Sequence, residues 1–101
     1  MHRILIDNIE NLKAVCLKYP VKSLYAFGSV CTEKFNDHSD IDLLISLKPM
    51  DYGDYADTYF ELVEKFENIF KRPVDLITDK SLGNPYFIES INQTKTPIYE
   101  A

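Results

Sequence analysis

Two aspartates stand at the head of an apolar run, residues 40–47, which reads DIDLLISL. The alternation predicts a strand in which Asp40 and Asp42 share one face while Ile41 points into the core. The rise of a strand places their α-carbons about 7 Å apart. Ionised carboxylates beside a buried strand need a cation, a hydrogen-bond network or water, because an unpaired buried charge is costly. The simplest such cation is a divalent metal ion.

A strand and a tight turn precede the two aspartates. Residues 21–27 read as a strand, and the pair Gly28-Ser29 follows it. Glycine permits a backbone geometry that a side chain would obstruct, and residues 29–34 are expected to form one or two helical turns. Free backbone N–H groups at such a turn suit phosphate oxygens, and the Ser29 hydroxyl adds a donor.

Two longer helices are predicted from the spacing of apolar residues. The first covers residues 3–18, where Ile6 and Val15 widen the apolar stripe. The second covers residues 54–71, with Asp54 as its N-cap and aromatic residues along its buried face.

The last third of the chain predicts a short strand and a helix. Residues 74–78, VDLIT, read as a strand that Asp75 interrupts. The dipeptide Asn84-Pro85 signals a helix that extends to residue 94. Residues 98–99 either add an edge strand or pack against the domain. The 101 residues therefore predict one α+β domain, a small mixed sheet covered by helices, with strand directions left open.

Composition narrows the possible partners and the compartment. The formal net charge of −5 argues against a broad nucleic-acid-binding surface, although a nucleotide held through a metal ion remains compatible with it. Cys16 and Cys31 show no metal-ligand spacing and are expected to be reduced thiols. No signal peptide or membrane-spanning run is expected, so the chain is predicted to be soluble and cytoplasmic.

Three carboxylates in a sheet context suit phosphoryl or nucleotidyl transfer assisted by two metal ions. Asp40 and Asp42 would supply ligands from one strand, and Asp75 a third from a neighbouring strand. Each signal is weak alone, because Gly-Ser pairs and Asp-x-Asp sequences are common in proteins. Their combination in this order is more specific.

The ordered motifs resemble those of the DNA polymerase beta nucleotidyltransferase superfamily, and the short, helix-first layout resembles its minimal nucleotidyltransferases (MNT-type proteins). The resemblance covers nearly the whole chain and implies a nucleotidyltransferase fold, ATP or another nucleoside triphosphate as substrate, and two Mg²⁺ ions. By position, Asp40 and Asp42 match the family's metal pair. Asp75 matches its third acidic residue, which acts as base and ligand. Gly28 and Ser29 match its triphosphate-binding turn.

The resemblance also implies a partner. Minimal nucleotidyltransferases are often paired with a small helical HEPN protein as antitoxin and toxin. The nucleotidyltransferase is then expected to silence the HEPN ribonuclease by binding it, by attaching AMP to it, or by both. The acceptor, the preferred base and any homo-oligomer are left open by the sequence.

One departure from the family pattern follows the Gly-Ser turn. Many relatives continue with an arginine and a glycine, where this chain has Thr32 and Glu33. The cation near the phosphates is thereby lost, and Lys34 is the nearest candidate to replace it. The sequence does not place the other candidate cations, which are Lys48, Lys71, Arg72 and Lys80.

Three hypotheses therefore follow from the sequence. The first is a Mg²⁺-dependent nucleotidyltransferase that transfers a nucleoside monophosphate, AMP from ATP, and acts as an antitoxin. The second is a catalytically impaired module of the same fold that neutralises a partner by covering it, as the altered turn suggests. The third is a structural acidic domain in which the Asp-x-Asp pair has no special role.

Overall fold

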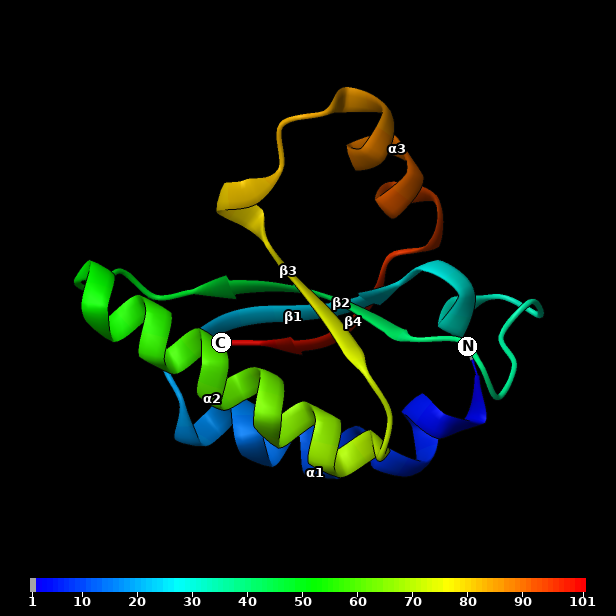
Figure 1. Ribbon diagram of the computed structural model, residues 1–101, viewed down its shortest axis with the longest axis horizontal. Helices are drawn as coiled ribbons and strands as arrows, with labels where there is room; N and C mark the ends of the chain where they lie inside the picture. Colours follow the sequence, from blue (N-terminus) through cyan, green and yellow to red (C-terminus); the bar gives the residue numbers. More distant parts are fainter. Residues whose placement is uncertain (1) are drawn as a thin grey trace.

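The computed structural model describes residues 2–101 and contains a four-stranded sheet with helices on both sides (Figure 1). The strand order is β3-β2-β1-β4; β1 runs antiparallel to β2 and β4, and β2 runs parallel to β3. This confirms the predicted α+β class with a mixed sheet. The elements in chain order are α1 (Arg3–Lys18), β1 (Val21–Phe27), the 3₁₀ turn η1 (Gly28–Cys31), β2 (Ile41–Leu47), α2 (Tyr52–Phe70), β3 (Val74–Thr78), η2 (Asp79–Ser81), α3 (Pro85–Thr94) and β4 (Thr96–Glu100).

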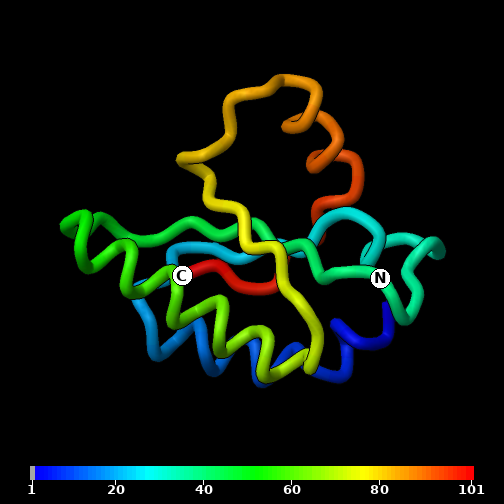
Figure 2. The backbone as a smooth tube through the Cα atoms, viewed as in Figure 1, coloured from blue at the N-terminus to red at the C-terminus, as the bar shows by residue number. Residues whose placement is uncertain are grey.

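The C-terminal strand β4 pairs with β1, although the two strands lie at opposite ends of the sequence. The tube in Figure 2 shows β4, in red, running along β1, in blue and cyan. Of the two alternatives that the sequence left open for residues 98–99, the structure confirms the edge strand. No helix within residues 2–101 is both long enough and apolar enough to cross a bilayer.

One face of the sheet carries the hydrophobic core. Ile41, Leu43 and Ile45 of β2 are fully buried, as the alternation in residues 41–47 predicts. They pack together with buried side chains of α1 and α2, which cover this face (Figure 1). The polar side chain of Asp42 consequently lies on the opposite face, where buried neighbours on both sides hold it in place. Helices α1 and α2 leave this face uncovered, so we call it the open face, and α3 packs on it against β1. The main helical contributors to the core are Leu5, Leu12, Cys16, Leu62, Phe66 and Phe70.

The two cysteines behave as packed side chains. Cys16 is buried in α1, and burial raises the pKa of its thiol to about 12. Cys31 is partly buried at the end of η1, and both thiols are free. A thiol with so high a pKa is a poor nucleophile, which favours a packing role for Cys16.

Two details of the helices differ from the sequence-based expectation. Helix α2 begins at Tyr52 with Asp51 as its N-cap, so Asp54 falls in the first turn instead of capping it. In α1, Ile6 remains 53% exposed, so the apolar stripe is narrower than expected. Both errors are local. Helix propensity does not determine at which residue a helix begins. The apolar stripe of a helix can also be wider than the part of its surface that packs against the sheet, so residues at the border of the stripe stay exposed.

Side chains of α2 bond to the outer edge of β3. The Tyr59 hydroxyl donates to the backbone oxygen of Leu76 at 2.6 Å, and the Val74 N–H donates to the Glu67 carboxylate at 3.0 Å. Unpaired backbone groups at a sheet edge invite association with other chains. These two bonds satisfy part of that edge within the chain and fix α2 against the strand that carries Asp75.

We predict that Tyr59→Phe lowers the free energy of unfolding by about 1 kcal/mol, because the Leu76 carbonyl loses its hydrogen-bond donor. Urea denaturation followed by circular dichroism measures this. Tyr52→Phe is the matched control, since Tyr52 is 96% exposed and should tolerate the same change without loss. Equal stability of the two variants would contradict a structural role for the Tyr59 bond.

Candidate functional site

The candidate site is centred where the end of β1 meets the start of β2. Phe27 pairs with Asp42, so the next residue, Gly28, lies directly beside the Asp42 carboxylate. Gly28 has φ +75°, a conformation that residues with a side chain rarely adopt. A β-carbon placed at Gly28 would lie only 2.5 Å from Asp42 Oδ2. Glycine is therefore required here both by the backbone conformation and by the close approach of the carboxylate.

Strand β3 brings a second carboxylate beside Asp42. In the parallel register of β2 and β3, Asp42 pairs with Asp75. Asp40 lies one residue before β2. Asp42 is partly buried, whereas Asp40 and Asp75 are exposed. The structure therefore brings all three predicted aspartates to the same end of the sheet, next to Gly28 and Ser29.

The electrostatics of Asp42 reflect this crowding of negative charge. Burial, followed by the negative charges of Asp75 and Asp40, raises the pKa of the Asp42 carboxyl from its usual 3.8 to about 6. Bringing a divalent cation to this place would relieve the repulsion, and carboxylate oxygens are the ligands that Mg²⁺ prefers. The donor set therefore fits a metal ion in its chemistry.

The three aspartates do not yet form a closed ligand set. Within residues 2–101, no three His, Cys, Asp or Glu side chains are gathered closely enough to hold a metal ion as they stand. Asp42 is fixed by its strand, while the two exposed carboxylates are those with room to adjust. Binding of a cation would therefore require Asp40 and Asp75 to move toward Asp42.

The turn after Gly28 is closed by Thr32. The Thr32 N–H and hydroxyl both donate to the Ser29 carbonyl, at 2.9 and 3.0 Å. The predicted one or two helical turns are thus a single 3₁₀ turn, which ends at Cys31. Thr32 stands where relatives are expected to carry arginine, and here it terminates the turn through hydrogen bonds.

The first N–H of the turn is held from the far end of the chain. The Gly28 N–H donates to the Thr94 hydroxyl, at the C-terminal end of α3, over 2.8 Å. Sequence reasoning missed Thr94, because no motif marks a threonine that lies 66 residues beyond the turn. Only the docking of α3 against β1 and η1 brings the two together.

The structure places Arg72 beside the loop that precedes Asp40. Its guanidinium donates to the carbonyls of Asn36 and Ser39, at 3.2 and 3.0 Å, and lies 4.7 Å from the ring centre of Phe35. Arg72 therefore supports the loop that presents Asp40. Lys34 is exposed in the same loop, and its side chain has no hydrogen bond or ion pair within residues 2–101.

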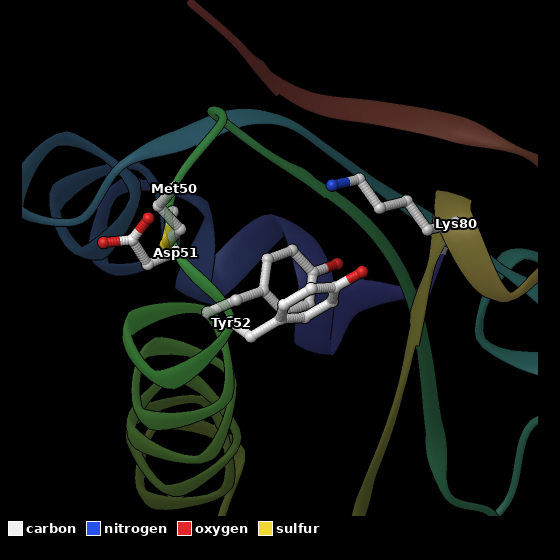
Figure 3. A pocket seen from close by; sticks show the side chains of 5 residues that line it. Met50, Asp51, Tyr52 and Lys80 are labelled. Carbon is white, nitrogen blue, oxygen red and sulfur yellow. The ribbon is translucent and has the colours of Figure 1, made fainter.

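Lys80 lies at the other end of the sheet. Its neighbour Asp79 accepts a hydrogen bond from the Ser46 hydroxyl. Ser46 lies four residues after Asp42 in β2, and four residues of strand span about 13 Å. The Lys80 ammonium lies 5.1 Å from the ring centre of Tyr55. Figure 3 shows Lys80 extending from η2 across from Met50, Asp51 and Tyr52. These residues line a cavity of about 400 Å³. Lys48, just after β2, belongs to the same end, whereas Lys71 terminates α2.

A second cavity of about 400 Å³ adjoins Asp75. It runs between α2 and β3, and aromatic side chains form one wall. This cavity offers space next to one of the three carboxylates, on the side away from Gly28. Its lining includes Ala56, Tyr59, Phe60, Asp75, Leu76 and Ile77.

Comparison with known proteins identifies the family. Residues 10–101 match the family described as "Polymerase beta, Nucleotidyltransferase". The chain belongs to this family. It is 41% identical over 76 residues to the Methanocaldococcus jannaschii protein named "Putative protein adenylyltransferase MJ1379", covering 75% of each chain. A second protein of that organism, MJ1217, carries the same description and is 38% identical over 78 residues, covering 75% of this chain and 74% of its own. The activity class is therefore that of a nucleotidyltransferase.

Solved structures with low sequence identity share the fold. A "putative minimal nucleotidyltransferase" matches with a TM-score of 0.73 at 23% identity and covers 96% of each chain. A toxin–antitoxin structure with AMP-PNP matches with a TM-score of 0.71 at 18% identity, over 93% of this chain and 74% of that one. An MNT antitoxin in complex with a tri-AMPylated Shewanella oneidensis HEPN toxin matches with a TM-score of 0.64 at 17% identity, over 95% and 72%. These matches confirm the predicted nucleotidyltransferase fold.

We predict that Gly28→Ala lowers the free energy of unfolding by about 1–2 kcal/mol, since φ +75° is costly for alanine. The added methyl group also displaces the Asp42 carboxylate. Gly53→Ala is the matched control: nothing lies within 4 Å of a β-carbon there, and alanine favours the helix. Chemical denaturation of both variants measures the difference, and a Gly28→Ala protein as stable as the parent would refute the steric requirement.

We predict that Asp42→Asn stabilises the protein at neutral pH. The folded-state pKa of Asp42 lies above its unfolded value of 3.8, so folding favours the protonated form, and stability falls as pH rises from about 4 to about 6. The full shift would correspond to about 3 kcal/mol. Because the carboxyl is partly exposed and screened by water, we expect a gain of about 1 kcal/mol at pH 7.5.

The measurement is the melting temperature of parent and variant between pH 4 and pH 8. The gain from Asp42→Asn should vanish near pH 4, where the parent carboxyl is protonated. Asp57→Asn, an exposed position on α2, is the control for removing one negative charge. A gain of the same size at pH 4 and pH 8 would rule out ionisation of Asp42 as its cause.

Proposed function

We propose that this protein is a Mg²⁺-dependent nucleotidyltransferase that transfers AMP from ATP to a hydroxyl acceptor. Asp40, Asp42 and Asp75 would hold the metal ions, and Gly28 and Ser29 would bind the triphosphate, with Lys34 as the nearby cation that the sequence indicates. The observation that carries the proposal is the position of Asp42, which lies against Gly28 on one side and pairs with Asp75 on the other.

The proposed reaction forms one bond to phosphorus and breaks another. The acceptor oxygen attacks the α-phosphorus of ATP, its proton passes to Asp75, and pyrophosphate leaves. Bound metal ions supply positive charge that stabilises the leaving phosphates. Ser29 orients the phosphates through its N–H and hydroxyl. The cavity beside Asp75 supports this assignment of the base, since it leaves space for an acceptor at that carboxylate.

The proposed partner is a HEPN-type toxin, for which this chain would be the antitoxin. Support comes from the fold shared with an MNT antitoxin whose solved structure includes an AMPylated HEPN toxin. The net charge of −5 would suit a basic partner surface. We further propose that the protein works in the cytoplasm, in keeping with its two free thiols.

A second candidate function is a binding module of the same fold without catalysis. Two observations favour it. Thr32 and Glu33 replace the expected arginine and glycine, and the three aspartates are not gathered into a closed ligand set. Such a module would neutralise its partner by covering it, and replacement of the aspartates would leave that neutralisation intact.

We predict that Mg²⁺ and ATP together raise the melting temperature of the parent protein, because only the folded state binds them; a ligand at a hundred times its Kd contributes about 2.7 kcal/mol. Either ligand alone should give a smaller shift. Asp40→Asn/Asp42→Asn should abolish the joint shift. Asp54→Asn/Asp57→Asn, with both changes on exposed positions of α2, should retain it and serves as the matched charge control.

Transfer of AMP is measured on the same variants, and on the single variant Asp42→Asn, with ATP labelled at its α-phosphate and the purified partner. Normal transfer by Asp42→Asn would refute the metal assignment. No joint shift in the parent, together with full neutralisation of the partner by Asp40→Asn/Asp42→Asn, would establish the binding module instead.

A further inference from the structure

We infer that the C-terminal end of α3 completes the triphosphate site: Lys95 supplies the cation that the turn itself lacks, and Thr94 holds the turn in place. This inference rests on the proposed function, because it assigns residues to the same nucleotide site. The positive charge for the phosphates would then come from a residue near the end of the chain, more than sixty residues after the Gly-Ser turn.

Thr94 fixes the backbone at the start of the turn. Its hydroxyl accepts from the Gly28 N–H at 2.8 Å, and this contact is partly buried. Without it, the Gly28 N–H would lose its partner in a confined place, which is costly. The bond thus stabilises the left-handed conformation that lets the Asp42 carboxylate lie against the Gly28 backbone.

Helix α3 is docked firmly enough to position these residues. Asn84 caps its N-terminus, accepting from the N–H groups of Tyr86 and Phe87. The Phe87 ring packs edge-on against Phe27, with ring centres 6.2 Å apart, and Ile91 is almost completely buried. The end of α3 is therefore held against the end of β1, beside the turn.

Lys95 presents an ammonium group on the open face of the sheet. Its Nζ lies 5.0 Å from the ring centre of Tyr25. Tyr25 pairs with Leu44, and two residues further along Phe27 pairs with Asp42, so Lys95 is located on the face that carries Asp42. Two residues of strand correspond to about 7 Å, which the long lysine side chain can span by rotation.

The Lys95 charge is available for a ligand. Lys95 is exposed, and within residues 2–101 the one ion pair joins Arg3 to Asp7, so no carboxylate in this part of the chain pairs with it. The Glu100 carboxylate accepts a hydrogen bond from the hydroxyl of Tyr25, the ring that Lys95 contacts, and forms no ion pair with Lys95 within residues 2–101. A lysine held only by an aromatic face can move to phosphate oxygens, which bind ammonium groups through charge-assisted hydrogen bonds.

Other placed cations fit this role less well. Arg72 donates to two loop carbonyls, and Lys80 lies at the opposite end of β2. Lys34 is the competing candidate, because it follows the turn and its side chain is exposed. The choice between Lys34 and Lys95 decides whether the phosphate cation belongs to the turn or to the end of α3.

The charge is tested by titrating the full chain with ATP and Mg²⁺ in a calorimeter at two salt concentrations. Lys95→Gln should weaken binding roughly tenfold and reduce its salt dependence, and Lys95→Arg should restore most of the affinity. Lys13→Gln, on the exposed side of α1, controls for the loss of one positive charge. Lys34→Gln is measured in parallel as the competing assignment.

The positioning role of Thr94 is tested with a pair of near-isosteric variants. Thr94→Val removes the acceptor for Gly28 and should weaken nucleotide binding severalfold, whereas Thr94→Ser keeps the hydroxyl and should bind as the parent does. Thr96→Val is the control, since it removes the nearby bond from the Thr96 hydroxyl to the Thr94 carbonyl without touching Gly28. Melting temperatures confirm that each variant is folded.

The outcomes separate this inference from the proposed function. If the parent binds and Lys95→Gln binds equally well, or if Lys34→Gln alone weakens binding, the Lys95 assignment is overturned while the nucleotidyltransferase proposal stands. Equal affinity of Thr94→Val and Thr94→Ser overturns the positioning role. If the parent itself binds no nucleotide, the proposed function fails and the inference fails with it.

Discussion

The close approach of the Asp42 carboxylate to the Gly28 backbone is the contact on which the rest of the site depends. It exists because β1 and β2 pair antiparallel in a register that sets Phe27 opposite Asp42. That register is in turn secured by the core, since a slip of one residue would turn Ile41 and Leu43 out of the apolar face and Asp42 into it. The packing that stabilises the sheet thus also fixes the position of the central carboxylate.

At Asp42, the role that we propose in metal binding opposes the stability of the fold. The strand that holds Asp42 rigidly also deprives it of water, and the parallel pairing with β3 adds the charge of Asp75 beside it. A chain selected for stability alone would not gather carboxylates at the edge of its core. The repulsion would favour binding of the proposed divalent cation, because the cation would remove an unfavourable interaction in addition to forming new bonds.

The parts of the fold and of the site that depend on a local sequence pattern could be predicted from the sequence. Alternation in residues 41–47 assigned Asp42 to the open face, and helical spacing found α1 to the residue at both ends. Strand order and direction could not be predicted, because they depend on how separate elements pack. The same limit explains why Thr94 was missed. Its role comes from the docking of α3 on β1 and η1, which no spacing within the motif reports.

The candidate site has an acidic half and a half around the Gly28 turn, and the sequence pattern describes these two halves to different extents. The acidic half lies on adjacent strands, so a short pattern of Gly-Ser and Asp-x-Asp describes it almost fully. The half that we propose binds phosphate depends on the backbone of Gly28, which Thr94 holds from the other end of the chain. A turn anchored in this way does not need its own arginine, provided that a cation stands elsewhere on the same face. The loss of the expected arginine at Thr32 therefore bears on where the positive charge comes from, and it does not by itself imply that phosphate binding has been lost.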